Sequence, residues 1–365
     1  MNKKMRIALM IASLTKGGAE RVMANLADYL AEQGHEVILV TQYKKEDEYA
    51  LNPKVKRIVF DLTEEELANN RIANFIKRFL KLRSVWKAQR PDVILSFIGK
   101  NNIMTLLTSR LLKIPVAVSV RAEPKEEYPG SLMRFLARNL FAHADGVVLQ
   151  TKRSFDFFPE KVQKRAIILR NPVSKDFFRE RYEGEREKTI VAVGRVDENK
   201  NHEMLIRAFA NIADEFPDYK VVIYGEGDCR QKLIRLANEF NLSERVLLPG
   251  SIEKVADAIY KTRVFVLTSN SEGVPNTLIE AMTMGLTVIS TDCPCGGPAE
   301  LISDLKNGIL VPVGDVQSLQ VNLQKVLNDL QMADEIGRNA KKTSDIFEKE
   351  KVCKEWEAFL LSLCR

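Results

Sequence analysis

Cysteine is scarce in this 365-residue chain, and its five copies are unevenly spaced. An odd, scattered set argues against a disulfide framework and favours a reducing compartment, which makes the cytoplasm the default location. Cys293 and Cys295 form the only close pair, and the three histidines lie far apart in the sequence. Because a zinc site needs about four ligands at coherent spacing, we expect no metal site.

Long apolar runs are also missing. No stretch approaches the roughly 18 to 20 apolar residues of a membrane-spanning helix, so any membrane contact is expected to be peripheral. The run at 7–14 resembles the apolar core of a signal peptide, but it is short and leads into Gly17 and Gly18. This pattern is more typical of a strand that enters a glycine turn.

Charge of one sign is not in large excess, since the net charge is +6. Such a balance permits an acidic partner without identifying one. The basic residues are most concentrated in one helical segment, 71–90, without interleaved exposed aromatic residues. A nucleic-acid partner is therefore not expected.

What the chain does contain is an alternation of strand-length apolar runs and helical patterns, over a length that exceeds one hydrophobic core. Continuous Val, Ile and Leu runs separated by helices predict parallel strands buried on both faces. The expected strands are 6–12, 37–41, 55–60, 93–96, 116–120, 146–150 and 166–169 in the first half, and 189–193, 220–224, 246–248, 264–267, 288–290 and 308–311 in the second. The pattern predicts an α/β fold with two doubly wound, parallel-sheet domains.

The polar segment 171–188 interrupts this alternation and carries a proline near its start, which is typical of a connection between domains. We expect an N-terminal domain at 1–170, a C-terminal domain at 189–345, and a final helix at 346–365 that packs back on the N-terminal domain. Ligands of such sheets bind outside the carboxyl ends of the strands, so the functional residues are expected in strand-to-helix loops.

Two glycine-containing loops follow expected strands. Gly17 and Gly18 open the first helix, where backbone amides and the helix N-terminus suit an anion. The second loop, 225–227, lacks the third glycine of a dinucleotide fingerprint. A tight structural turn would use glycine in either place, so neither loop identifies a ligand alone.

Two cations follow the first strand of the second half. Arg195 offers a planar fork and Lys200 a point charge, and both are placed to reach a diphosphate. The alternative is a solvated, charged loop. A strand end that faces the expected ligand site favours the first interpretation.

The most informative loop runs from 271 to 280, after the strand at 264–267. Asn276 and Thr277 are expected to cap a helix, with Glu280 about one turn inside it. Glu272 and Glu280 could then project toward one ligand. The competing interpretation is a capping acid followed by an ordinary surface glutamate.

Together, the loop from Gly17 to Arg21, Gly194-Arg195 with Lys200, the glycine loop 225–227 and the Glu272-x7-Glu280 pair resemble glycosyltransferase family 4. The resemblance spans essentially the whole chain. It implies the GT-B fold, in which two Rossmann-like domains face each other across a cleft. It also implies a retaining, sugar-nucleotide-dependent transferase that needs no metal or other cofactor.

The resemblance assigns roles to individual residues. Arg195 and Lys200 would bind the donor diphosphate and stabilise the leaving group, and with Glu272 they form the expected catalytic set. Glu280 would accept hydrogen bonds from the ribose. The further donor-binding residues implied are Gly17, Gly18, Ser251, Ile252, Gly273, Val274, Pro275, Asn276 and Thr277.

One position departs from the family pattern. Many members place a histidine in the loop after the strand corresponding to 116–120, whereas this chain has Arg121 nearest to that position. We expect Arg121 to contact the acceptor or the donor. Retention in this family is thought to proceed by front-face attack, so that no side-chain base is required.

A narrower resemblance is to the lipid-linked-oligosaccharide N-acetylgalactosaminyltransferases of bacterial protein glycosylation, through residues 11–21, Ser96-Phe97 with Asn101, and the basic helical segment between them. It implies a UDP-sugar donor, with N-acetylgalactosamine as the best choice among hexoses and N-acetylhexosamines. The acceptor implied is a growing surface glycan linked to polyprenyl diphosphate.

The segment 71–90 contains seven basic residues and no acid, together with apolar residues at helical spacing. A surface helix packed on the first domain explains the apolar residues. We add the hypothesis that its bases, among them Lys77, Arg78 and Lys81, bind anionic phospholipid or the acceptor pyrophosphate. The protein would then act at the inner face of the cell membrane as a peripheral protein.

Two rival functions remain open at this point. A sugar-nucleotide epimerase or phosphorylase of the same fold would need side chains for chemistry at the sugar. A non-catalytic sugar-nucleotide-binding protein would be expected to lack either the cations or the glutamates described above, and this chain lacks neither.

Overall fold

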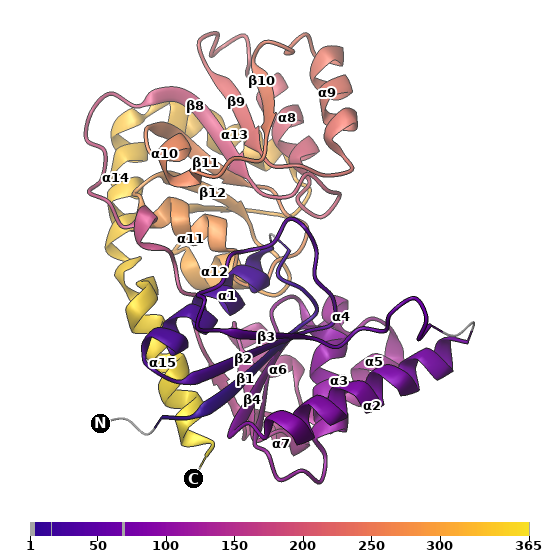
Figure 1. Ribbon diagram of the computed structural model, residues 1–365. Coiled ribbons are helices and arrows are strands. Elements are labelled where there is room, and N and C mark those ends of the chain that lie inside the picture. The colour runs from indigo at the N-terminus through magenta and orange to yellow at the C-terminus, as the bar shows by residue number, and fades with distance from the viewer. Residues whose placement is uncertain (1–3, 16, 68–69, 365) are drawn as a thin grey trace. The chain divides into compact units, whose positions relative to one another are not determined.

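The computed structural model describes residues 4–15, 17–67 and 70–364, which form two compact units (Figure 1). The first unit combines residues up to Pro172 with the C-terminal segment from Lys349. The second unit comprises Val173–Glu348. Each unit is built around one parallel sheet.

Seven parallel strands form the sheet of the first unit. They are β1 (Arg6–Ile11), β2 (Glu36–Thr41), β3 (Lys56–Val59), β4 (Val93–Phe97), β5 (Val116–Ser119), β6 (Gly146–Leu149) and β7 (Ala166–Ile168). Their order is β3-β2-β1-β4-β5-β6-β7. The chain therefore changes direction between β1 and β4, which is the switch point of a doubly wound sheet.

Helices cover both faces of this sheet. They are α1 (Gly18–Glu32), α2 (Arg71–Gln89), α3 (Gly99–Ser109), α4 (Pro124–Glu127), α5 (Gly130–Leu140), α6 (Lys152–Phe157), α7 (Glu160–Gln163) and α15 (Lys349–Ser362), with a 3-10 turn η1 (Phe141–His143). One core layer joins α1 and α15 to the sheet through Leu26 and Trp356. The opposite layer joins α2 and η1 to it through Trp86 and Phe141.

The second unit repeats the arrangement with six parallel strands. They are β8 (Glu187–Val193), β9 (Lys220–Tyr224), β10 (Val246–Gly250), β11 (Thr262–Leu267), β12 (Thr287–Thr291) and β13 (Ile309–Val311), in the order β10-β9-β8-β11-β12-β13. The helical elements are α8 (His202–Ala210), α9 (Arg230–Glu239), α10 (Val255–Ile259), α11 (Asn276–Thr283), α12 (Gly297–Leu301), α13 (Val316–Asn328) and α14 (Leu330–Lys342), with 3-10 turns η2 (Lys175–Phe177) and η3 (Asp345–Phe347). Here the switch point lies between β8 and β11.

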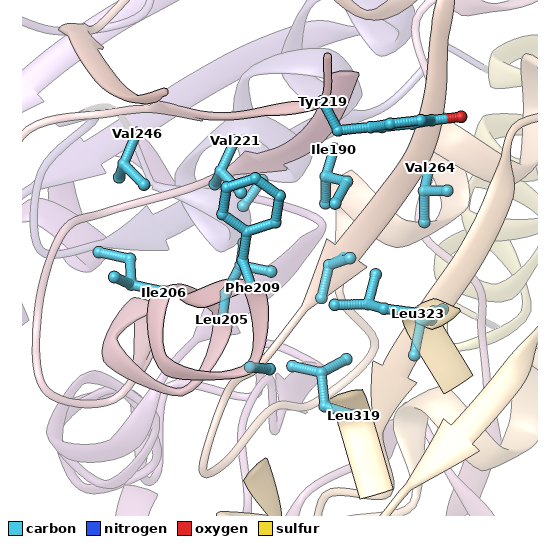
Figure 2. Close-up of a cluster of buried hydrophobic side chains, with 14 of the residues drawn as sticks. Ile190, Leu205, Ile206, Phe209, Tyr219, Val221, Val246, Val264, Leu319 and Leu323 are labelled. Atoms are coloured by element: carbon cyan, nitrogen blue, oxygen red, sulfur yellow. The ribbon is translucent and has the colours of Figure 1, made fainter. Parts of the chain in front are cut away.

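Branched aliphatic side chains explain why these strands are central. Figure 2 shows Ile190 and Val264, from the two strands at the switch point, packed with Phe209 of α8 and Leu323 of α13. The other face of the same sheet buries Val191 against the layer that contains α11. Strands covered on both faces are expected to read as continuous apolar runs, and all thirteen expected strands are present.

The connections at the unit boundary are short. The backbone N–H of Val173 donates to the carbonyl of Phe347 at 3.0 Å, so the segment that follows Pro172 is already tied to the second unit. The expected linker at 171–188 is therefore divided, with most of it folded in that unit. Trp356 of α15 donates to the carbonyl of Arg170 at 3.0 Å within the first unit.

Candidate donor site

The loops that follow β8 and β11 are joined at the switch point of the second sheet. The backbone N–H of Asn270 donates to the carbonyl of Asn199 at 2.7 Å. The hydroxyl of Thr268 donates to the carbonyl of Lys200 at 2.9 Å. These bonds hold the two loops at the carboxyl ends of adjacent strands, which is where doubly wound sheets bind ligands.

Lys200 and Glu272 meet at this point. The Lys200 ammonium forms an ion pair with Oε1 of Glu272, and the hydroxyl of Ser269 donates to the same oxygen at 2.7 Å. Each of the paired side chains is 14% exposed. No side chain of the described residues is bonded to Oε2 of Glu272, which leaves this oxygen able to accept from a ligand hydroxyl. The structure thus brings together two of the three predicted catalytic residues.

Arg195, the third member of that set, is placed differently. Its side chain is largely exposed, and its guanidinium lies 3.3 Å from the carboxylate of Asp197. An exposed ion pair of this kind contributes little to stability. The guanidinium is therefore able to turn toward an anionic ligand at low energetic cost.

His202, at the start of α8, supports the loop that carries both cations. Its Nε2 lies 3.2 Å from the carbonyl oxygen of Arg195, and because a carbonyl only accepts, Nε2 carries the proton. Nδ1 is buried and without a partner among the described side chains. Burial, aided by the charge of Lys200, lowers the pKa of His202 to about 4, so the imidazole is neutral at physiological pH.

Glycines allow three loops of this edge to approach one another. A Cβ on Gly225 would lie 1.8 Å from the carbonyl oxygen of Gly194, and one on Gly227 would lie 2.4 Å from that of Val196. The N–H of Gly225 also donates to the carbonyl of Gly250, directly before the predicted base-binding residues Ser251 and Ile252. The structure therefore gives the glycines of 225–227 a packing role.

Helix α11 begins directly after the loop that contains Glu272. The prediction that Asn276 and Thr277 cap this helix is wrong, because the chain enters through Pro275 in an extended conformation and no side chain caps α11. The first-turn amides and the helix dipole therefore point toward residues 273–275. Glu280 is the fifth residue of α11 and is only 2% exposed.

Gly273 is fixed by a close contact with the next helix. A Cβ on Gly297, the first residue of α12, would lie 1.6 Å from the carbonyl oxygen of Gly273. The hydroxyl of Thr291 donates to the carbonyl of Ser269 at 2.6 Å on the same side. The predicted donor-binding stretch from Gly273 through Val274 to Thr277 is thus shaped by α12 as well as by its own sequence.

Two of the predicted donor-binding residues, Gly17 and Gly18, lie in the first unit. Gly17 precedes α1 with ordinary backbone angles, and a Cβ there would lie 2.3 Å from the carboxylate of Glu20. The absence of a side chain at Gly17 therefore leaves room for the Glu20 carboxylate, in addition to any ligand role. Gly18 is the first residue of α1.

Arg121 is buried, and its contact with the acceptor or the donor stays a prediction. Its guanidinium lies over the rings of Phe97 and Trp356, at 4.7 and 5.8 Å from the ring centroids. Nη2 donates to Oδ1 of Asn171 at 2.5 Å. Burial lowers the pKa of Arg121 to about 10. These contacts connect the end of β5 with α15 and with the end of the first unit.

Three basic side chains of α2, at the positions predicted to bind lipid or the acceptor, are bonded within the first unit. Lys77 donates to the carbonyl of Glu66 at 2.6 Å, Arg78 pairs with Asp61 at 2.8 Å, and Lys81 pairs with the carboxylate of Glu66 at 2.8 Å. The segment 71–90 contains no acid, but the loop just before it supplies two. The charge that these three residues offer to a partner is therefore smaller than the sequence of the helix indicates.

The described part of the chain contains neither a cluster of metal ligands nor a membrane-spanning helix. Residues 4–15, 17–67 and 70–364 contain no group of three or more His, Cys, Asp or Glu side chains arranged to hold a metal ion. Within the same ranges, every helix is too short or too polar to cross a bilayer.

The chain matches known glycosyltransferases along nearly its whole length. Residues 17–165 match the glycosyl transferase 4-like domain, and residues 174–343 match the glycosyl transferases group 1 domain. A Campylobacter jejuni protein is 31% identical over 354 residues, which cover 96% of this chain and 97% of the relative. It is named GalNAc-alpha-(1->4)-GalNAc-alpha-(1->3)-diNAcBac-PP-undecaprenol alpha-1,4-N-acetyl-D-galactosaminyltransferase.

A second C. jejuni relative is 28% identical and covers 98% of this chain and 99% of its own length. It is named N-acetylgalactosamine-N,N'-diacetylbacillosaminyl-diphospho-undecaprenol 4-alpha-N-acetylgalactosaminyltransferase. Among solved structures, Anabaena HepE in complex with UDP is similar with a TM-score of 0.81 at 17% identity, over 98% of this chain and 100% of that one. Sucrose-phosphate synthase from Thermosynechococcus elongatus has a TM-score of 0.82 at 18% identity, over 99% of both chains.

The two doubly wound units and these structural matches define the GT-B fold. Sequence identity over the full length then decides the family. The chain belongs to glycosyltransferase family 4.

Proposed function

We propose that the chain is a retaining hexosyltransferase or N-acetylhexosaminyltransferase that uses a UDP-sugar, with UDP-N-acetylgalactosamine as the best candidate. Its acceptor would be a glycan linked to polyprenyl diphosphate. The observation that carries the proposal is the Lys200–Glu272 pair at the switch point of the second sheet. The full-length similarity to two lipid-linked N-acetylgalactosaminyltransferases supports the choice of substrates.

Departure of UDP requires positive charge beside the diphosphate, and the second unit contains two cations that could supply it. The bond between the anomeric carbon and the β-phosphate oxygen breaks, and UDP leaves with the electron pair. Lys200 and Arg195 would stabilise the negative charge that develops on the diphosphate, where fixed cations help most. Because two side-chain cations are available, the proposal includes no metal ion.

The remaining steps place the sugars. The acceptor hydroxyl would attack the same face of the anomeric carbon, and its proton would pass to the departing phosphate oxygen. The open Oε2 of Glu272 would accept from a hydroxyl of the donor sugar, since Lys200 and Ser269 already occupy Oε1. Glu280 would accept from the ribose, and Ser251 and Ile252 would contact the base. Gly17 and Gly18 stay predicted contacts of the donor phosphate.

The test combines the purified full-length protein with a panel of UDP- and GDP-sugars, in the presence and absence of a polyprenyl-diphosphate-linked glycan. We expect stabilisation by a UDP-sugar and release of UDP that depends on the acceptor and persists in EDTA. Formation of an epimeric sugar nucleotide without acceptor would identify an epimerase and refute the proposal. Binding of the sugar nucleotide without any transfer would indicate a non-catalytic binding protein.

A matched pair of variants tests the donor site within the same experiment. Glu280→Gln should weaken nucleotide binding, because Glu280 is buried in α11 beside the loop that carries Glu272. Glu239→Gln changes an exposed glutamate at the end of α9 and is the control. Equal affinities in the two variants would contradict the assignment of Glu280.

A further inference from the structure

Helix α5 of the first unit has an apolar face that points away from the protein. Met133, Leu136 and Leu140 pack against the core layer that also contains Trp86. Leu132 and Phe135 lie outside this contact and are 68% and 63% exposed. Since successive helical residues are rotated by about 100°, these two large side chains occupy the solvent side of the helix.

Basic residues flank the exposed pair. A groove of about 460 Å³ runs along α5, and its lining consists of Ser131, Arg134, Phe135, Arg138, Asn139, Pro159 and Lys161. Three of these residues are cations and none is an acid.

The cations of this groove are not neutralised. Within the described ranges, Arg134, Arg138 and Lys161 form no ion pair with a carboxylate. Lys161 donates to the side-chain oxygen of Asn139 at 2.7 Å, and Arg138 lies 5.7 Å from the centroid of the Phe157 ring. Both contacts leave the positive charges available to an anion.

Three basic residues of α2 differ from those of α5 in this respect, because Lys77, Arg78 and Lys81 are bonded to Asp61 and Glu66 or to backbone carbonyls beside them. Arg71 and Lys87 of α2 are exposed and form no ion pair within the described ranges. The exposed large apolar residues of α2 are Ile72, Phe75, Ile76 and Leu80. Helices α2 and α5 both pack against α3, so the same part of the first unit carries both sets of exposed apolar residues.

We propose that α5 is the helix through which the first unit binds an anionic phospholipid bilayer. Leu132 and Phe135 enter the boundary between headgroups and acyl chains, while Arg134, Arg138 and Lys161 bind lipid phosphates. A bilayer fits this surface because its apolar interior lies directly beneath a layer of phosphates, which matches the apolar side chains of α5 flanked by unpaired cations of α5 and α7. The inference rests on the proposed function, whose acceptor is linked to a membrane lipid, and it is measured by binding, without turnover.

The experiment compares sedimentation of the full-length protein with phosphatidylcholine vesicles, with and without phosphatidylglycerol. The triple variant R134Q/R138Q/K161Q should lose about a hundredfold in affinity for the anionic vesicles, at roughly fivefold for each basic residue near the surface. The matched control K77Q/R78Q/K81Q removes the same number of charges from α2 and should lose far less. The double variant L132S/F135S should lose affinity for both kinds of vesicle.

A spectroscopic readout covers the case in which a variant folds poorly. Phe135→Trp places a fluorophore on the exposed face, whereas the two native tryptophans, Trp86 and Trp356, are fully buried. Vesicles should shift the emission of this variant to the blue, and brominated lipid should quench it. The proposal is overturned if the wild-type protein does not bind anionic vesicles, or if the α2 variant loses binding and the α5 variants do not.

Activity separates this inference from the proposed function. The α5 variants should retain turnover of a short-chain, water-soluble acceptor, because α5 belongs to the first unit and Lys200 and Glu272 to the second. Vesicle binding without any sugar transfer by the wild-type protein would refute the proposed function and leave the membrane surface intact.

Discussion

His202 links the stability of the second unit to pH. Its imidazole is buried and donates to the carbonyl of Arg195 through Nε2, which leaves Nδ1 in a site that disfavours a second proton. Burial is the main cause that lowers its pKa to about 4, and the charge of Lys200 adds to it. In the unfolded chain the same histidine titrates near 6.5.

The sign of the effect follows from these two values. Between pH 6.5 and 4 the unfolded chain binds a proton that the folded chain does not, so acidification stabilises the unfolded state. At pH 5 the pH lies about 1.5 units below the pKa of the histidine in the unfolded chain. At 1.36 kcal/mol per unit, the folded state has then lost about 2 kcal/mol of stability. Above pH 6.5 the contribution of His202 is fully present.

The variant His202→Gln keeps a side-chain N–H donor but removes the titration. We expect its free energy of unfolding to vary less between pH 7.5 and 5 than that of the wild-type protein, by about 2 kcal/mol. The assay is urea unfolding followed by far-ultraviolet circular dichroism. His143→Gln, at an exposed histidine of the first unit, is the control and should retain the wild-type pH dependence.

The two tryptophans give an internal control, because Trp86 and Trp356 both lie in the first unit. The transition that their fluorescence reports should be the same in H202Q and in the wild-type protein. An unchanged pH dependence of the circular dichroism transition in H202Q would refute the reasoning. It would mean that His202 is not held neutral by its surroundings.

Three further predictions rest on other parts of the molecule. Lys200→Ala should reduce kcat by about 10²–10³-fold, the range for loss of one group that stabilises transition-state charge, whereas Lys188→Ala, at the opposite end of β8 in an exposed pair with Asp218, should leave it unchanged; equal rates would contradict the site. Gly297→Ala should destabilise the protein by about 1–3 kcal/mol or more in thermal unfolding, because its Cβ has no room, and a near-native melting temperature would show that α12 can move away. Iodoacetamide should label the partly exposed Cys229 and Cys364 of the native protein before the three buried cysteines. Burial raises the pKa of two of the buried thiols, Cys293 and Cys353, to about 12. Equal labelling of all five cysteines would refute this.

The strands were predictable because each sheet is covered on both faces. Parallel strands in that position have no polar side, so apolar runs such as those in Arg6–Ile11 and Val116–Ser119 stand out from the helices around them. The order of the strands was not predictable in this way, since it depends on hydrogen bonds between segments far apart in the sequence. The pairing of β8 with β11 is an example.

The candidate site also combines features that the sequence predicts with contacts that depend on the strand order. Each loop could be chosen from the sequence, because glycine and charged residues directly follow a strand. The ion pair between Lys200 and Glu272, which are 72 positions apart, required the strand order. His202 and Ser269 were not selected, because a neutral imidazole on a carbonyl and a hydroxyl on a carboxylate leave no spacing signal.

The basic helix shows how a sequence window can mislead. The segment 71–90 itself contains no acid. Asp61 and Glu66 lie just upstream in the sequence, and in the folded chain they form ion pairs with Arg78 and Lys81 of the helix. The apolar residues of this segment were interpreted as the side of a surface helix that packs on the first domain. Leu82 and Trp86 are buried, whereas Ile72 and Phe75 are exposed, since only the second half of α2 contacts the core layer.

We propose above that this family 4 protein transfers a sugar from a UDP-sugar with retention and without a metal ion. The most direct measurement is the reaction of the full-length protein with UDP-N-acetylgalactosamine and a polyprenyl-diphosphate-linked glycan in EDTA, with the product analysed by mass spectrometry and by NMR of the new anomeric centre. The account predicts an acceptor extended by N-acetylgalactosamine in α-linkage, and loss of this product in K200A. A β-linked product, or a product that forms only when a divalent metal is added, would contradict it.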